Sequence, residues 1–425
     1  MPNAYEAMND AELKAAIADL EKQADDLRAL DLKLDMARGK PSPQQTALSR
    51  PMLDLLGSES DLSDEGVAAD NYGCPEGLPS ARRLAAELLG VDEKNVIVNG
   101  SSSLNLMHDV VCNAYTHGIG GNKPWSQQGK VKFLCPVPGY DRHFGITADL
   151  GIENVPVAMT DNGPDMDEIE RLVAADDSIK GIWCVPKYSN PEGIIYSKDT
   201  IVRMASMKPA APDFTIMWDN AYCIHEFDGD YVEFPDILHQ CKKYGNYDMV
   251  YEFASTSKIT FPGDGVACMA TSEANLEDFE KWIGIQTISY DKVNQQRHVL
   301  YLQNRAHTLK LMKKHAAFMK PKFEAVLSTL DREIAPLEIA SWSHPKGGYF
   351  VSFDAMPGTA KRTLALCKEA GVAMTAAGAT FPYGIDPNDS NIRIAPSFPP
   401  VEDVEKAIAV FCTCVKMSAL EKLGV

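Results

Sequence analysis

One lysine of this chain stands directly behind an apolar run that is typical of a buried strand. In the segment FASTSKITFPGDG, Lys258 follows the hydroxyl side chains of Ser255, Thr256 and Ser257, and a Pro-Gly turn comes next. The ordinary interpretation of such a residue is a solvated strand end. A lysine that is desolvated there can instead lose its proton and act as a nucleophile or general base. Other residues of the chain are needed to distinguish the two interpretations.

Polar residues also follow the other apolar runs of the chain. Five such segments stand out: Gly100-Ser101-Ser102-Ser103, Pro138-Gly139-Tyr140, Tyr188-Ser189-Asn190-Pro191, Asp219-Asn220-Ala221-Tyr222 and Ser255-Thr256-Ser257-Lys258. A buried carboxylate such as that of Asp219 is costly without a partner. Serines that open a helix lie where backbone N–H groups and the helix dipole can bind an anion, although serines also serve as simple N-caps.

Alternating strands and helices must position these residues. The apolar runs predict strands at 95–100, 130–137, 153–159, 179–186, 214–222, 248–255 and 265–271. Periodic patterns predict helices at 77–90, 101–118, 141–151, 165–176 and 199–207. This alternation indicates an α/β fold with a mainly parallel central sheet that helices cover on both faces. Ligands of such sheets bind at the carboxyl ends of the strands, which is where the polar segments lie.

The two ends of the chain are predicted to form a second, smaller α+β domain. An amphipathic helix is expected at about 10–34, and long helices are expected within 274–331. Strands in GGYFVSF and NIRIAPSF mix with helices towards the C-terminus. We expect residues 45–305 to form the large domain, and residues 1–44 and 306–425 to form the small one.

Composition and charge argue against several classes of function. The chain has 425 residues and a formal net charge of −18, which disfavours a nucleic-acid surface and docking on anionic lipid. No apolar run of about 18 residues predicts a membrane span, and the N-terminus lacks the pattern of a signal peptide. The ten cysteines form no CxxC pair. Free thiols in a reducing compartment, a cytoplasmic location and no metal site are therefore expected.

In their order along the chain, the motifs closely resemble those of the fold type I pyridoxal-phosphate (PLP) aminotransferases. They are NYGCPEG, NGSSS, PGY, SNPEG, DNAY, STSK and NIRIAPSF, and the resemblance runs from about Asp35 to the C-terminus. ARGKPSP, PGYDRHF and STSKITFPG are most similar to the type Ic aspartate aminotransferases. The resemblance implies the fold type I PLP-transferase architecture and PLP as cofactor. It also implies amino-group transfer between aspartate or glutamate and 2-oxoglutarate or oxaloacetate.

Each motif then implies a role toward the cofactor. Lys258 would hold PLP as a Schiff base, and Asp219 would keep the pyridine nitrogen protonated. Asn190 and Tyr222 would donate to the phenolic oxygen of PLP, and Tyr140 would stack on its ring. We expect Lys258, Asp219 and Tyr140 to be the catalytic residues. The phosphate would lie beside a set of hydroxyl groups, those of Ser101, Ser102, Ser103, Ser255 and Ser257.

The resemblance also implies contacts with the substrate, made by Arg393, Asn190, Arg38, Gly39 and Arg142. A planar guanidinium such as that of Arg393 suits the α-carboxylate. The distal carboxylate of an acidic substrate needs a cation once it is buried. Arg142 is favoured over Arg38 for that role because it follows Tyr140 at the carboxyl end of a strand. The alternative for Arg142 is a surface pair with Asp141 or a nearby helix.

A homodimer with shared active sites is the assembly that the resemblance implies. Tyr72 matches a tyrosine that reaches the phosphate of the neighbouring subunit in relatives, and SYDKVNQQRH is similar to a segment that relatives lend to the partner's site. One departure concerns the phosphate. Gly265 and Val266 stand where many relatives carry a phosphate-binding arginine, so serines, helix N–H groups, Tyr72 and the partner chain would have to replace it.

Three alternatives stay open at this point. The same residues could serve a PLP-dependent lyase or decarboxylase, or an aminotransferase of other amino acids. A PLP-binding regulator is a further alternative, but it would carry a DNA-binding winged helix ahead of this domain. The segment before MARGKPSP is short and acidic, which disfavours a regulator.

Overall fold

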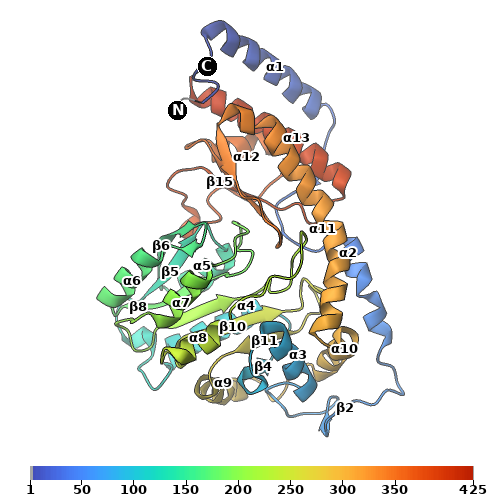
Figure 1. Ribbon diagram of the computed structural model, residues 1–425, viewed down its shortest axis with the longest axis vertical. Helices are drawn as coiled ribbons and strands as arrows, with labels where there is room; N and C mark the ends of the chain where they lie inside the picture. Colours follow the sequence, from blue (N-terminus) through green and yellow to red (C-terminus); the bar gives the residue numbers. More distant parts are fainter. Residues whose placement is uncertain (1–2, 425) are drawn as a thin grey trace.

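The computed structural model describes residues 3–424, and it has a lower part around one large sheet and an upper part around a small one (Figure 1). The large sheet has eight strands in the order β4-β11-β10-β9-β8-β5-β6-β7. Their bounds are β4 Val96–Val98, β5 Lys132–Val137, β6 Glu153–Thr160, β7 Gly163–Pro164, β8 Ile179–Cys184, β9 Thr215–Asp219, β10 Val250–Ser255 and β11 Ala267–Ala270.

Most neighbouring strands of the large sheet run parallel. The pairs β10-β9, β9-β8, β8-β5 and β5-β6 are parallel, whereas β11 runs antiparallel to both β10 and β4, and β7 runs antiparallel to β6. β4, β5, β9 and β10 therefore end at the same edge. The polar segments that follow these strands in the sequence are brought to one place by this register.

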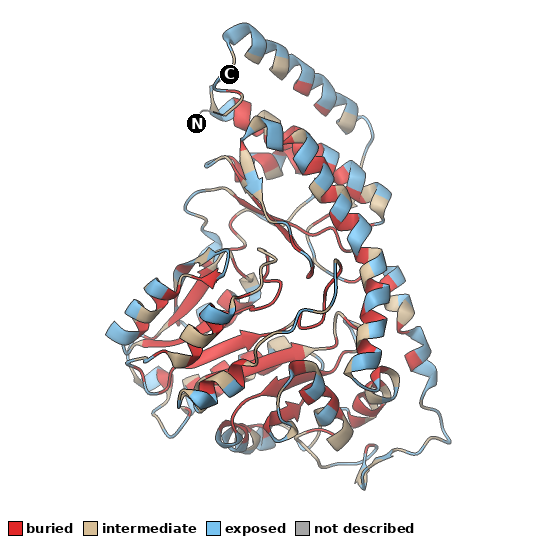
Figure 2. Ribbon diagram, in the orientation of Figure 1, coloured by how far each residue is buried: buried red, intermediate tan, exposed pale blue. Residues whose placement is uncertain are grey.

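Helices cover both faces of this sheet. On one face lie α4 (Ser103–Thr116), α5 (Asp141–Asp149) and α9 (Glu273–Gln286), which pack on alternate strand residues such as Phe133, Trp183 and Phe253. On the other face lie α6 (Met166–Ala175), α7 (Lys198–Ser206) and α8 (Ile237–Lys243), which pack on residues such as Ile182 and Trp218. The central strands β8, β9 and β10 are buried on both sides, as Figure 2 shows, which explains their continuous apolar runs.

The upper part combines both ends of the chain. Its antiparallel sheet has the order β12-β13-β15. A separate parallel pair, β1-β14, attaches the N-terminal segment to the upper part. The bounds are β1 Leu34–Asp35, β12 Ala340–Trp342, β13 Val351–Ala355, β14 Val372–Ala373 and β15 Asn391–Ile394, with helices α1 Asp10–Arg28, α11 Arg305–Glu333, α12 Ala360–Glu369 and α13 Val401–Lys422. The long helix α11 runs between the upper and lower parts (Figure 1).

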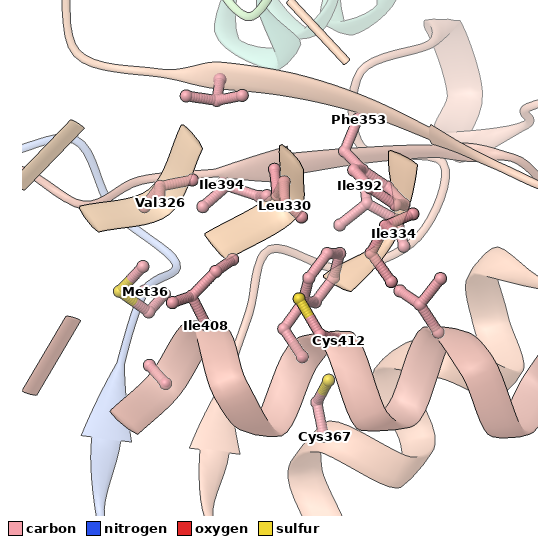
Figure 3. Close-up of a cluster of buried hydrophobic side chains, with 14 of the residues drawn as sticks. Met36, Val326, Leu330, Ile334, Phe353, Cys367, Ile392, Ile394, Ile408 and Cys412 are labelled. Atoms are coloured by element: carbon pink, nitrogen blue, oxygen red, sulfur yellow. The ribbon is translucent and has the colours of Figure 1, made fainter. Parts of the chain in front are cut away.

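A second core holds the upper part together. Figure 3 shows Phe353, Ile392 and Ile394 of the small sheet against Leu330 of α11 and Ile408 of α13. Phe353 also packs edge-on against Phe411, with ring centres 4.9 Å apart. Fully burying an aliphatic or aromatic side chain stabilises a protein by about 1.5–3 kcal/mol, so this cluster fixes the strand β15 that carries Arg393.

The remaining elements are short or lie beside the two sheets. They are the helices α2 Pro43–Leu48, α3 Pro79–Leu89 and α10 Lys292–Leu302, the strands β2 Ser63–Asp64 and β3 Val67–Ala68, and the 3-10 turns Arg50–Asp54, Glu93–Asn95, Trp125–Gln127, Tyr247–Met249, Ala335–Leu337 and Pro382–Gly384. α3 ends at Gly90, whose φ of 79° is a conformation that glycine adopts without strain.

The predicted α/β class and the mainly parallel sheet are confirmed, and the order of strands and helices agrees with the sequence pattern. The first helix is shorter than expected, because the chain leaves the helix after Arg28 and pairs with β14 from Leu34. The domain boundaries at 44/45 and 305/306 stay a prediction. All ten cysteines are free thiols. No helix within residues 3–424 is both long and apolar enough to cross a membrane.

Candidate active site

A cleft of about 660 Å³ opens where β4, β5, β9 and β10 end and the upper part begins. Thirteen of the residues that the sequence predicted for the site line it: Arg38, Gly39, Ser102, Ser103, Tyr140, Arg142, Asn190, Asp219, Tyr222, Ser255, Ser257, Lys258 and Arg393. They come from both ends of the chain and from the middle. The fold therefore brings together residues that are distant in sequence.

Lys258 is held by a turn that follows β10 directly. The Thr256 carbonyl accepts hydrogen bonds from the backbone N–H groups of Ile259 and Thr260, and the Thr256 hydroxyl accepts one from Val266 N–H at 2.9 Å. The Nζ of Lys258 then lies 4.7 Å from the centre of the Tyr222 ring. The half-buried amine is thus aimed into the cleft rather than solvated at a strand end.

Asp219, the last residue of β9, is buried and keeps one carboxylate oxygen free. Its Oδ2 lies 2.9 Å from Nε2 of His143, a buried residue of α5 whose ring stacks on Trp183. Its Oδ1 is buried and has no hydrogen-bond partner among the described residues. A buried acceptor without a partner is costly, so this oxygen is set to receive a donor from a bound group.

Two tyrosines lie next to the Lys258 amine. Burial raises the pKa of the Tyr222 hydroxyl, and the charge of Asp219 raises it further. Tyr349 stacks near Tyr222, with ring centres 6.0 Å apart, and its hydroxyl accepts a hydrogen bond from Gln45 Nε2. Both phenols therefore stay protonated at neutral pH and can act as hydrogen-bond donors. Burial also raises the pKa of Tyr140, although the Lys258 charge opposes this.

Hydroxyl and backbone N–H groups gather at one end of the cleft. Ser102 is the N-cap of α4, but its side chain makes no capping hydrogen bond. In the first turn, Asn105 N–H donates to the Ser102 carbonyl, and the Ser102 side chain leaves the N–H groups of Ser103 and Leu104 uncapped. The Ser255 hydroxyl donates to Ser257 Oγ at 3.1 Å. A Cβ atom on Gly265 would lie only 3.1 Å from the Ser101 carbonyl and from Ser257 Oγ. Glycine at 265 keeps this pocket tight, and the arrangement suits an anion such as a phosphate.

Arg393 lies on β15 with its guanidinium nearly buried. Its Nη1 donates to Asn190 Oδ1 at 3.2 Å and to Asp141 Oδ1 at 3.3 Å, and its Cζ lies 4.8 Å from the centre of the Phe350 ring. Gly39 allows the N-terminal segment to pass this ring, because a Cβ atom there would lie 2.4 Å from Phe350 Cζ. The guanidinium is thus fixed facing the cleft.

The other two arginines of the cleft, Arg38 and Arg142, are exposed. The expected alternative for Arg142, a pair with Asp141, is not what the structure has. Asp141 pairs with Arg393 instead, 3.3 Å away. No ion pair of Arg142 is found among the residues that the structure describes.

Ser101 and Tyr72 lie outside the set of residues that line the cleft. Ser101 is exposed and faces Gly265 through its carbonyl group. Tyr72 is 77% exposed, and the amine of the buried Lys292 holds its loop by donating to Gly73 O at 2.8 Å. Asp264, next to the glycine that stands in place of the relatives' arginine, pairs with Arg297 of α10.

Sequence reasoning missed His143 and Tyr349. His143 was visible in PGYDRHF, three positions after Tyr140, which is the spacing that puts two residues on one face of a helix. Tyr349 lies in GGYFVSF, where the apolar pattern indicated only a strand. No local signal placed its ring beside Tyr222.

A sequence model of the family described as aspartate amino-transferase matches residues 8–425. The chain belongs to this family. It is 42% identical to the aspartate aminotransferase of Corynebacterium glutamicum over 95% of this chain and 93% of that protein. The crystal structure of an aspartate transaminase from the same organism superposes with a TM-score of 0.96 at 40% identity, covering 99% of each chain.

A more distant relative bears on the fold alone. LysN, an α-aminoadipate aminotransferase from Thermus thermophilus solved with N-(5'-phosphopyridoxyl)-L-leucine, has a TM-score of 0.72 at 20% identity and covers 92% of this chain and 93% of that one. The family match and the near relatives make the protein an aminotransferase of fold type I, and aminotransferases of this fold depend on PLP. The resemblance, the fold class and the enzyme class predicted from the sequence are confirmed.

Proposed function

We propose that this protein binds PLP in the cleft and moves an amino group between aspartate or glutamate and 2-oxoglutarate or oxaloacetate. One observation carries the proposal. The cleft joins a half-buried lysine, a buried carboxylate with a free oxygen and an arginine held for a carboxylate, which are Lys258, Asp219 and Arg393. The activity named for the Corynebacterium relative is consistent with it.

The residues present fit PLP. Asp219 Oδ1 is a buried acceptor that needs a donor, which the protonated pyridine nitrogen would supply. The serines and the first turn of α4 suit its phosphate, and the Asn190 amide and the Tyr222 hydroxyl suit its phenolic oxygen. When bound, PLP supplies an electron-withdrawing ring that stores the amino group between the two half-reactions. Tyr140, at the N-cap of α5, is proposed to pack on that ring.

Lys258 has two proposed tasks, to hold the cofactor covalently and to move the substrate's α-proton. Its neutral amine is the nucleophile in the first task and the general base in the second. His143 keeps Asp219 oriented through the hydrogen bond to Oδ2, so the free Oδ1 stays directed to the ring.

The substrate is proposed to bind through its carboxylates. Arg393 would hold the α-carboxylate in a bidentate pair, with Asn190 and Gly39 beside it. Arg142 is proposed for the distal carboxylate, with Arg38 as its neighbour across the cleft. An exposed cation without a protein partner is free to pair with an entering anion, which is why Arg142 stays the favoured residue.

The working unit is proposed to be a homodimer. Tyr72 is highly exposed and lies away from its own cleft, while the buried Lys292 fixes its loop. A large tyrosine held rigidly on the surface suits insertion into a neighbouring subunit. We also propose a cytoplasmic location, which the ten free thiols favour.

Product analysis tests the proposed reaction. The purified protein loaded with PLP should convert L-aspartate and 2-oxoglutarate to oxaloacetate and glutamate in equal amounts. Release of ammonia or carbon dioxide without a 2-oxo acid acceptor would indicate a lyase or decarboxylase. A strong preference for aromatic or aliphatic amino acids would remove the acidic substrate and leave the aminotransferase class.

A further inference from the structure

A carboxylate lines a cleft whose proposed substrates are anions. Among the described residues that line it, the cations are Arg38, Lys40, Arg142, Lys258 and Arg393. Two carboxylates line it as well, and Asp219 is already engaged by His143. Asp141 is the other one. A negative charge beside the proposed α-carboxylate site repels the substrate, so the position of Asp141 needs a physical explanation.

The hydrogen bonds of Arg393 supply that reason. Nη1 carries two hydrogens, and both are used, one on Asn190 Oδ1 and one on Asp141 Oδ1. Nε is buried and has no partner among the described residues, so an entering carboxylate reaches the guanidinium first at Nη1 and Nη2. A bidentate pair with a substrate carboxylate through Nη1 and Nη2 therefore competes with the two protein acceptors that Nη1 already has.

Asp141 is the acceptor that can leave. Its side chain is 40% exposed, it lies at the first position of α5, and its contact with Nη1 is the longer of the two at 3.3 Å. Asn190 is buried, and the turn that contains it is closed by the hydrogen bond from Gly193 N–H to Ser189 O. A carboxylate on a flexible side chain at the cleft surface rotates away at much lower cost than a buried amide in a closed turn.

We propose that Asp141 is an internal counter-ion of the substrate site, which occupies Arg393 in the free enzyme and is displaced by the α-carboxylate. The inference rests on the proposed function, because it takes Arg393 as the α-carboxylate site. Without Asp141 the guanidinium, whose side chain is 9% exposed, would be a nearly buried charge with no anion. Asp141 thus stabilises the empty site and lowers its affinity for every carboxylate.

Replacing Asp141 with asparagine separates these two effects. Asn keeps an oxygen that accepts from Arg393, but it removes the competing charge. The holoenzyme of Asp141→Asn should bind succinate, a non-reacting dicarboxylate, about three- to tenfold more tightly than the wild type in calorimetric titration. The KM for aspartate and 2-oxoglutarate should fall by a similar factor, while kcat stays within about twofold. Asp149→Asn, an exposed site at the other end of α5, should leave all these values unchanged.

Each outcome of this experiment decides something. Unchanged or weaker succinate binding by Asp141→Asn would overturn the proposal, because weaker binding would mean that Asp141 only orients Arg393. A wild-type holoenzyme that neither binds succinate nor transaminates aspartate would refute the proposed function itself. If the variant fails to fold, a crystal structure of the wild-type holoenzyme with bound succinate tests the proposal instead. Asp141 must then have left Nη1, and an intact Asp141–Arg393 pair beside bound succinate would overturn the proposal.

Discussion

At the scale of single residues, the site is defined by polar groups that the protein leaves incompletely paired. Within residues 3–424, Asp219 keeps a buried oxygen free, the hydroxyl of Ser102 does not cap its helix, and Arg142 lines the cleft without an ion pair. Each of these groups is costly or idle in the empty protein. Together these groups suit a cofactor with a hydrogen-bond donor on its ring and a phosphate, and a substrate that carries a second carboxylate.

The second anion is tested by Arg142→Ala. We expect kcat/KM for aspartate to fall about ten- to a hundredfold, because the charge-assisted hydrogen bonds to the distal carboxylate, worth about 1.5–3 kcal/mol, are lost. Alanine, which has no distal carboxylate, should be affected far less if the enzyme accepts it. Steady-state kinetics with both donors measure the difference, and Arg38→Ala serves as the matched variant. An equal decrease in kcat/KM for aspartate and alanine would show that Arg142 does not bind the substrate side chain.

At the scale of elements, a hydrogen-bond network joins the turn that carries Asn190 to the strands of the small sheet. The Ser352 hydroxyl of β13 donates to Glu192 Oε1 at 3.0 Å, and Asn391 Nδ2 of β15 donates to Ser352 Oγ at 3.0 Å. Ser352 stands opposite Arg393 in the register of the two strands. Glu192 therefore ties the Asn190 turn to the strand that carries the proposed α-carboxylate site.

This network makes a prediction about pH. Burial raises the pKa of Glu192 to about 7, the Ser352 hydrogen bond opposes the rise, and the charges of Asp354 and Asp161 add to it. Between about pH 4.5 and 7, Glu192 is therefore protonated in the folded state and ionised in the unfolded chain. Because the unfolded state binds fewer protons, the free energy of unfolding decreases as the pH rises through this range.

Glu192→Gln removes that cost. The variant should match the wild type in stability near pH 4.5 and exceed it by on the order of 1–2 kcal/mol above pH 7, after solvent screening. Urea unfolding across this pH range measures the difference. Glu405→Gln, an exposed change on α13, is the control and should show no such trend. A stability difference that is flat with pH would contradict the assignment.

The sequence predicted the elements and the residues at their ends, but not the pairs between elements. Ser102, Asn190, Asp219 and Lys258 could be placed because each follows an apolar run, and parallel strands end at one edge. The His143–Asp219 hydrogen bond depends on how α5 lies against β9, which no local pattern encodes.

Packing between elements also decided the partner of Asp141. In the sequence, a pair with its neighbour Arg142 was the alternative interpretation, whereas in the structure β15 brings Arg393 to Asp141 from the other part of the molecule. For the same reason, Tyr349 was read only as part of a strand. Its position beside Tyr222 follows from the contact between the small sheet and the large one.

At the scale of the whole molecule, the proposed homodimer would use the exposed Tyr72 of one chain to complete the site of the other. Tyr72→Phe should weaken PLP binding by about 1 kcal/mol, roughly fivefold, because one hydrogen bond to the phosphate is lost. Equilibrium dialysis of the cofactor measures the change, and analytical ultracentrifugation should find a dimer for the wild type and for the variant. A fully active monomer would contradict the shared site.

The central claim is that Lys258 carries the cofactor, and chemical trapping tests it most directly. The PLP-loaded protein is reduced with sodium borohydride, which makes the link between lysine and cofactor permanent, and its peptides are then mapped by mass spectrometry. The phosphopyridoxyl group should be found on the peptide that contains Lys258, and Lys258→Ala should carry none and should not convert aspartate. A label on another lysine, or a Lys258→Ala protein that still transaminates aspartate at the wild-type rate, would contradict the account.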